Sequence, residues 1–206
     1  MNQLSGTKEL IFDAFIELTS MAGYENVSIR DIAKRVGINP ASLYYHFENK
    51  VKILDFAYEY YANHQYDNRQ PVEEMCTLIE TAKPEVVVRT LAYSFESSDQ
   101  KEYIRMVLIT KIVYMRLFQD PVANALFSES NIENSEYLVK ILNHGKSMGR
   151  IDADFDSETF ADVLIGSLQI MGVKSFSDPT YSVRQLDQES KIIAMLSKFL
   201  GAAMKN

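Results

Sequence analysis

Residues 27–50 are VSIRDIAKRVGINPASLYYHFENK, and this stretch decides how the rest of the chain is interpreted. Ser28 is a typical N-cap residue, and the acid three positions later, Asp31, makes a short-armed relative of the capping box. Apolar residues then recur on one face until Gly37, a residue that favours the left-handed conformation in which helices end. The first half of the stretch therefore predicts one short amphipathic helix.

A second short helix is predicted directly after the first. Asn39 and Pro40 supply a cap residue and a first-turn proline. Leu43 and Phe47 follow four residues apart, so they share a face and form the buried pair of this helix. Two short helices joined by a glycine-containing turn make a helix-turn-helix.

The outer face of the second helix carries side chains that suit DNA. With Leu43 and Phe47 inward, the residues on that face and its flanks are Ala41, Ser42, Tyr44, Tyr45 and His46. Hydroxyl and imidazole groups donate to phosphate oxygens, a small side chain permits close approach to a base, and a short helix enters a major groove about 12 Å wide. Lys50 begins the next helix, where a cation and exposed backbone N–H groups make a phosphate seat, and Ser28 opens the preceding helix in the same manner. From these residues alone, DNA binding is about as well supported as a helix-turn-helix that never meets DNA.

The segment from Thr7 to Leu54 resembles the N-terminal domain of the TetR (tetracycline-repressor) family of transcriptional regulators, and it covers about a quarter of the chain. The resemblance lies in VSIRDIA at 27–33, VGI at 36–38 and SLYYHFENK at 42–50. It implies DNA contacts, mostly to phosphates, from Ser42, Tyr44, Tyr45, His46 and Lys50. It also implies that Asn39, Pro40 and Ala41 begin the recognition helix near the bases. No Arg or Gln of that helix faces a guanine or adenine edge, so no operator sequence follows.

The rest of the chain also has helical periodicity, and alternation of period two is hard to find. A first helix is predicted from Leu4 to Ala22, with Gly23 as a left-handed stop and a buried stripe at Ile11, Ala14, Phe15, Leu18, Met21 and Ala22. A long helix is predicted from Asn49 to Tyr66. Four later prolines, at 71, 84, 121 and 179, separate further helices. The segment Gln100–Gln119 is apolar on most of its circumference and is predicted to be central.

These patterns predict an all-α fold with two domains. Residues 1–50 form the helix-turn-helix DNA-binding domain, and residues 51–206 form a helical ligand-binding and dimerisation domain. In the resembled family the C-terminal part varies in sequence, so only its helical layout is carried over.

The distribution of charge agrees with one DNA-binding end. The 206 residues have a net charge of -7, but residues 1–52 hold six basic and six acidic side chains, so the whole acidic excess lies beyond them. The one cysteine, Cys76, gives no disulfide framework and no metal-ligand spacing. No secretory signal layout and no apolar run of about 18 residues is present, so we expect a cytoplasmic protein with no membrane partner and no cofactor.

Two amphipathic stretches near the C-terminus are the predicted homodimer interface. In the resembled family the last two long helices pair across a two-fold axis as a four-helix bundle. The stretches comprise Phe160, Val163, Leu164, Ser167, Leu168 and Met171, then Ile192, Ile193, Leu196, Phe199, Leu200 and Ala203. Burial within one subunit is the alternative, because periodicity does not distinguish the two.

A small-molecule pocket is predicted from polar-tipped aromatics and methionines on interior helices. The candidates are Tyr61, His64, Tyr93, Met106, Thr110 and Tyr114. For any single one of them, ordinary core packing is the better-supported alternative.

The sequence therefore favours a ligand-responsive repressor that binds operator DNA as a homodimer and releases it when a small effector binds. An enzyme is the chief rival class, but the chain lacks HExxH and GxGxxG. The run from Gly145 to Gly149 has GxSxG spacing, but its surroundings indicate a helix rather than the strand-to-helix elbow that a nucleophilic serine needs. Gly145-Lys146-Ser147 resembles the end of a phosphate loop, yet position 140 is Lys rather than Gly. A regulator controlled by a protein partner or by concentration alone stays open.

Overall fold

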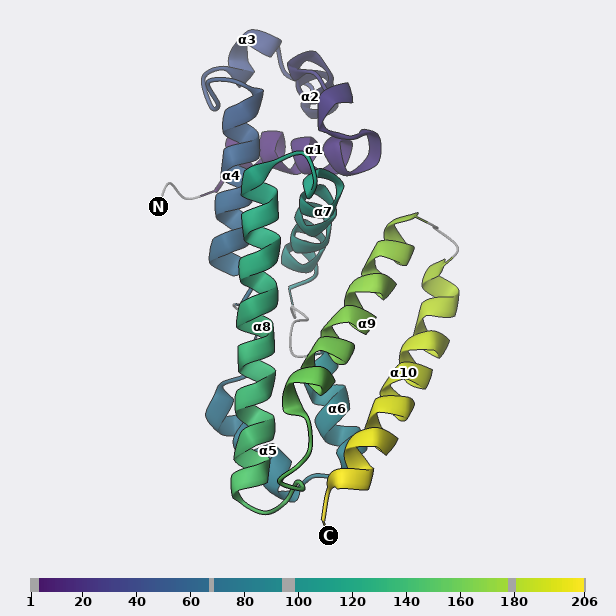
Figure 1. Cartoon of the computed structure of the whole chain (residues 1–206). Helices are drawn as coiled ribbons and strands as arrows, with labels where there is room; N and C mark the ends of the chain where they lie inside the picture. Colours follow the sequence, from purple (N-terminus) through teal and green to yellow (C-terminus); the bar gives the residue numbers. More distant parts are fainter. Residues whose placement is uncertain (1–3, 67–68, 94–98, 178–180, 206) are drawn as a thin grey trace. The chain divides into compact units, whose positions relative to one another are not determined.

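The computed structural model describes residues 4–66, 69–93, 99–177 and 181–205, with the backbone alone at 93, 175–177 and 181–190. Over these ranges the chain forms ten α-helices and one 3-10 helix, with a single isolated bridge between Ile151 and Met204 (Figure 1). The predicted all-α class is confirmed. None of the described helices has the length and apolar character that crossing a bilayer requires.

The helices divide between two compact units. Unit 1 comprises Met1–Asp67 and Ser97–Ser128, and it contains α1 (Gly6–Ala22), η1 (Tyr24–Asn26), α2 (Ile29–Val36), α3 (Pro40–Leu43), α4 (Lys50–His64), α7 (Gln100–Arg116) and the first part of α8 (Pro121–Ser147). Unit 2 comprises Asn68–Glu96 and Glu129–Asn206, with α5 (Val72–Thr81), α6 (Pro84–Tyr93), the rest of α8, α9 (Ser157–Ser177) and α10 (Tyr181–Ala203). The compact unit around the helix-turn-helix is thus larger than the predicted domain of residues 1–50.

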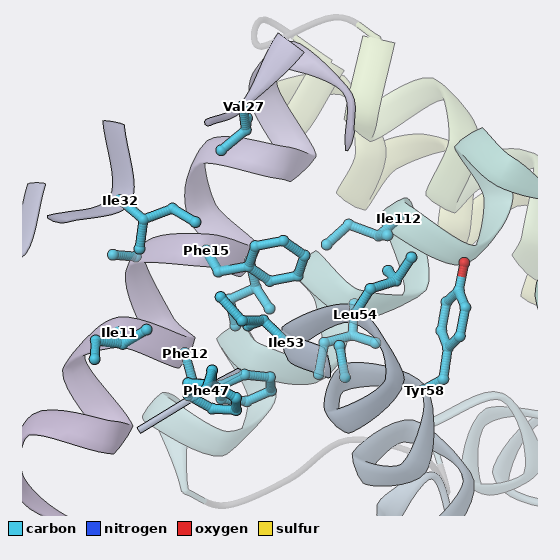
Figure 2. Close-up of a cluster of buried hydrophobic side chains, with 14 of the residues drawn as sticks. Ile11, Phe12, Phe15, Val27, Ile32, Phe47, Ile53, Leu54, Tyr58 and Ile112 are labelled. Atoms are coloured by element: carbon cyan, nitrogen blue, oxygen red, sulfur yellow. The ribbon is translucent and has the colours of Figure 1, made fainter. Parts of the chain in front are cut away.

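One hydrophobic core joins the helix-turn-helix to α4 and α7 in unit 1 (Figure 2). Phe12 and Phe15 of α1 are fully buried, and Ile32 of α2, Ile53 of α4 and Ile112 of α7 are equally inaccessible. Each side chain of this size contributes about 1.5–3 kcal/mol when it leaves water, so the core holds α2 and α3 against the longer helices. In Figure 1 α2 and α3 form the outer end of this unit, beside the start of α4.

Three details of unit 1 differ from the sequence expectation. Met21 is 76% exposed and Ala22 is also exposed, although both belong to the predicted buried stripe. Phe12 and Ile16, which that stripe left out, are buried instead. Gly23 has φ 84° and ψ 149°, so it has the positive φ of a glycine stop without the left-handed helical ψ.

Helix α7 is less enclosed by unit 1 than its composition predicted. Tyr103 and Ile104 are 42% and 49% exposed on this chain. The deeply buried Arg105 lies on the side that contacts α1, where its guanidinium bonds to Asp13 (Nε–Oδ1 2.7 Å, Nη2–Oδ2 3.0 Å) and to Glu9. An ion pair rather than a wholly apolar face therefore occupies part of the α1–α7 contact.

Unit 2 has its own core. Val87, Leu91, Ile141 and Leu142 of α6 and α8 are fully buried, together with side chains from α9 and α10. Helix α10 packs on both α6 and α9, and α9 and α10 lie side by side (Figure 1). Prolines begin or cap these helices as predicted, with Pro71 as N-cap of α5, Pro84 opening α6 and Pro121 opening α8; Pro179 lies outside the described residues.

Candidate nucleic-acid interface

Helix α2 begins with the predicted capping box. The Asp31 N–H donates to Ser28 Oγ at 3.2 Å, and the Ser28 N–H donates to Asp31 Oδ2 at 2.8 Å. The Ser28 hydroxyl also donates to the same carboxylate at 2.5 Å, and these hydrogen bonds hold the pKa of Asp31 below its ordinary value. The Ser28 hydroxyl is therefore engaged in capping the N-terminus of α2.

The turn between α2 and α3 follows the sequence prediction. Gly37 takes the left-handed conformation at φ 78° and ψ 29°, and the Ile38 N–H closes the helix end on the Ala33 carbonyl at 3.0 Å. Asn39 caps α3 by accepting from the Ala41 N–H at 2.9 Å, and Pro40 occupies its first position. These local bonds fix the direction in which α3 leaves α2.

Side chains of α3 and the turn after it point in two directions. Leu43 is fully buried and Phe47 is 5% exposed, so the inward pair is confirmed. Tyr45 is 94% exposed and Tyr44 is 54% exposed, although both are large aromatic residues. Ala41 and Ser42 are exposed as well, Asn39 likewise, while Pro40 and His46 are half-buried. The result is an exposed polar and aromatic surface over a buried apolar pair.

Lys50 begins α4, as predicted, and its ammonium also has partners within the chain. Its ammonium donates to the carbonyls of Tyr24 at 2.9 Å and Val27 at 3.0 Å, and it lies 4.0 Å from the centre of the Tyr24 ring. An ammonium has three donors, so two of them are directed to the chain's own backbone. The sequence did not indicate these hydrogen bonds, because the two carbonyls lie 26 and 23 residues before Lys50.

Two further cations belong to the candidate surface and were not assigned a role from the sequence. Arg30 and Lys34 are exposed on α2, four residues apart and hence on one side of the helix. The excess of local cations in residues 27–52 was the signal that could have identified them. Exposed cations beside exposed hydroxyls are the groups that bind a phosphate backbone.

The predicted ligand-lining residues are distributed over both units. Tyr61 is buried on α4, and Tyr114 of α7 is near enough for burial and the Tyr61 hydroxyl to raise the pKa of Tyr114 to about 12. His64 is half-buried with its ring 4.3 Å from that of Tyr60, and Met106 and Thr110 are half-buried on α7. The Tyr93 side chain lies outside the described residues. Unit 1 therefore brings Tyr61 and Tyr114 together.

The predicted interface residues divide into buried and exposed sets. Six belong to the chain's own core or are nearly inaccessible: Phe160, Leu164, Met171, Ile193, Leu196 and Leu200. Ser167, Leu168, Ile192 and Ala203 are half-buried, whereas Val163 and Phe199 are 43% and 58% exposed. Gly166, Ile170 and Met195 are also exposed on these two helices, and the sequence stripe did not single out Ile170 or Met195.

The comparison with family models agrees with this geometry. Residues 11–56 match the model described as "Bacterial regulatory proteins, tetR family". The same region is 48% identical over 48 residues to the biofilm operon icaADBC HTH-type negative transcriptional regulator IcaR of Staphylococcus aureus. That match covers 23% of this chain and 26% of the relative, so the chain spans about a quarter of the length of the curated relatives it matches.

Solved structures extend the likeness to the whole fold. The ketosteroid transcriptional regulator KstR2 of Mycobacterium tuberculosis aligns over 99% of this chain and 98% of its own, with a TM-score of 0.66 and 18% identity. A transcriptional regulator of the TetR family from Cytophaga hutchinsonii aligns over 97% and 96%, with a TM-score of 0.62 and 15% identity. At such identities the agreement concerns the fold alone.

Proposed function

We propose that this chain, whose N-terminal domain is of the TetR family, is a transcriptional repressor that binds operator DNA as a homodimer and releases it when a small molecule binds. The observation that carries the DNA-binding part is Tyr45, a large aromatic residue that is 94% exposed beside a buried Leu43 and Phe47. Tyr44 beside it is 54% exposed, so two hydroxyl-tipped aromatics lie together on the outer side of the helix-turn-helix, where such groups can donate to phosphate oxygens. Repression is supported by the likeness to a negative regulator over the same segment.

In this proposal α3 enters the major groove with Asn39, Pro40 and Ala41 near the bases. The hydroxyls of Ser42, Tyr44 and Tyr45 and the imidazole of His46 donate to phosphates on either side. Arg30 and Lys34 add cations along α2. Residues 1–50 supply these contacts, and α4 and α7 support them through the shared core of unit 1.

The DNA-binding surface of α2 and α3 is called the reading head below. In the proposed homodimer the second copy of the chain supplies a second reading head. A two-fold dimer presents two equal heads, which must lie about 34–36 Å apart to occupy successive major grooves on one side of DNA. The exposed apolar side chains of α9 and α10, including Val163 and Phe199, are the candidates for the contact. An effector that changes the spacing of the heads lowers affinity, because both heads no longer bind at once.

The effector site is proposed along α4 and α7. Tyr61, Thr110 and Tyr114 offer hydroxyls among apolar neighbours, which is the usual composition of a small-molecule cavity. The competing hypothesis is the same DNA-binding regulator without an effector, controlled by a protein partner or by its own concentration. An added metabolite that releases DNA favours the first, and release only on dilution or by a second protein favours the other.

The test is a selection of duplexes from a random-sequence library by the purified chain, followed by affinity measurements on the selected duplex. We expect Tyr45→Ala to raise Kd about 10-fold to 100-fold, corresponding to about 1.4–2.8 kcal/mol of lost contact. Tyr103→Ala is the matched control, since Tyr103 is an exposed tyrosine of α7. No enriched duplex, or equal binding by Tyr45→Ala, would contradict the proposal.

A further inference from the structure

Five side chains of unit 1 form a connected cluster between the helix-turn-helix and the corner that joins α7 to α8. We call it the Tyr24 cluster, and its members are Tyr24, Lys50, Tyr58, Arg116 and Asp120. Tyr24 lies in η1, directly before α2, whereas Arg116 ends α7 and Asp120 precedes α8. The cluster therefore connects segments about 90 residues apart in sequence.

Two cations lie over the ring of Tyr24. The Lys50 ammonium is 4.0 Å and the Arg116 guanidinium carbon is 4.4 Å from the ring centre. The face of an aromatic ring carries negative potential, so each cation is attracted to it. Lys50 also holds the η1 backbone through the Tyr24 and Val27 carbonyls, which ties the start of α4 to the segment that leads into α2.

Arg116 is itself held in a fixed position. Its Nε–H is shared between Asp120 Oδ2 at 3.0 Å and Tyr58 Oη at 3.1 Å, and the Tyr58 hydroxyl donates to the same carboxylate oxygen at 2.9 Å. Asp120 is 13% exposed and Arg116 16% exposed, so water screens this pair little. The hydrogen bonds outweigh burial and hold the pKa of Asp120 below its ordinary value, so the carboxylate stays charged at neutral pH. Figure 2 shows Tyr58 at the edge of the hydrophobic cluster.

We propose that Arg116 and Lys50 are positioning residues for DNA binding, acting through Tyr24 to set the orientation of α2 and α3 without touching DNA. This rests on the proposed DNA-binding function and assigns a role to the α7–α8 corner. Loss of the Arg116 guanidinium removes one of the two cations from the Tyr24 ring, so η1 is held less firmly and affinity at α3 falls. The cluster thus offers a physical connection from α7, where Thr110 and Tyr114 lie, to the reading head.

Salt dependence distinguishes this role from a phosphate contact. A cation that neutralises a phosphate lowers the slope of log affinity against log salt by about 0.9 when it is removed. A positioning residue weakens binding with the slope unchanged. The experiment measures Kd at several salt concentrations on the duplex selected by the wild-type chain, for Arg116→Ala and Lys50→Ala.

We expect both variants to raise Kd about 3-fold to 30-fold, with slopes equal to that of the wild type. The matched control is Arg89→Ala, which removes the same charge from an exposed ion pair in unit 2 and should leave Kd nearly unchanged. Tyr24→Phe keeps the ring and should bind as the wild type does. Tyr24→Leu should weaken binding in the same direction as Arg116→Ala but retains the ion pair between Arg116 Nη1 and Glu25 Oε1 of η1 (3.4 Å). A slope lower by about 0.9 for either cation, or wild-type affinity in Arg116→Ala, would overturn the proposal.

A second measurement needs no DNA and guards against loss of folding. Amide hydrogen exchange of residues 24–32 should be faster in Arg116→Ala and Tyr24→Leu, with exchange in α10 unchanged, while Tyr24→Phe and Arg89→Ala match the wild type. Uniformly faster exchange in both units, or unchanged exchange in residues 24–32, would overturn the positioning role. If the wild-type chain selects no duplex, the proposed function fails, and this measurement still decides whether the cluster orders the head.

Discussion

The outward surfaces of α3 in unit 1 and of α9 and α10 in unit 2 both expose large side chains, but of different kinds. Near α3 the exposed aromatics end in hydroxyls, with Tyr45 at 94% and Tyr44 at 54% exposure. On α9 and α10 the exposed residues Ile170, Met195 and Phe199 have no polar end at 50%, 55% and 58%. Polar-tipped aromatics suit a phosphate backbone, and wholly apolar side chains suit another apolar surface. The comparison teaches that the chemistry of the exposed tip, rather than exposure alone, indicates the partner.

The largest expected effect is on the apolar surface. In a two-fold dimer the same surface of both copies forms the contact, so Phe199→Glu buries two charges there. The dimer dissociation constant should rise at least about 100-fold. Analytical ultracentrifugation measures this directly. Phe118→Glu is the control, because Phe118 is 93% exposed in unit 1. A Phe199→Glu chain that stays dimeric would show that α9 and α10 are not the interface and break the comparison.

A comparable effect, on stability rather than on association, is expected from the inner side of α3. Leu43→Ala removes a fully buried side chain and should lower the free energy of unfolding by about 2–5 kcal/mol. Ser42→Ala, its exposed neighbour, should leave stability within about 0.5 kcal/mol. Urea unfolding followed by circular dichroism measures both. Equal losses of stability in the two variants would contradict the assignment of Leu43 to the buried side of α3 and Ser42 to the exposed side.

The smallest effect expected is a pH dependence located in unit 1. Because the folded-state pKa of Asp120 is lowered, its contribution to stability is present above the unfolded pKa, about 3.8, and is lost as pH falls through the folded pKa. Asp120→Asn should cost about 1–3 kcal/mol at pH 7 and less at pH 3. Urea midpoints at pH 3, 5 and 7 measure this, with exposed Asp154→Asn as control. An equal cost at all three pH values would contradict the assignment.

The helix-turn-helix could be predicted because its signals are local. The capping box of Ser28, the left-handed Gly37 and the cap at Asn39 each act within four residues, so the sequence contains the whole interaction. The inward direction of Leu43 and Phe47 follows from the same spacing. The outward position of Tyr45 then needs no further information.

The remaining features depend on contacts distant in sequence. The Lys50 ammonium donates to carbonyls 23 and 26 residues earlier, and local spacing does not predict these partners. Arg116 received no role at all, because its partner Tyr58 precedes it by 58 residues. In α9, Phe160 and Val163 belong to one periodic stripe, yet the first is 1% and the second 43% exposed. Periodicity marks an apolar face and does not say which part the chain covers by itself.

The most direct test of the central claim is a photocrosslink from the reading surface to DNA. A benzophenone side chain in place of Tyr45 should crosslink to the selected duplex on irradiation, whereas the same group in place of Tyr103 should not. Both positions are solvent-exposed tyrosines of unit 1, at 94% for Tyr45 and 42% for Tyr103. Crosslinking from Tyr103 with none from Tyr45 would contradict the account, because DNA would then bind at α7 rather than at α3.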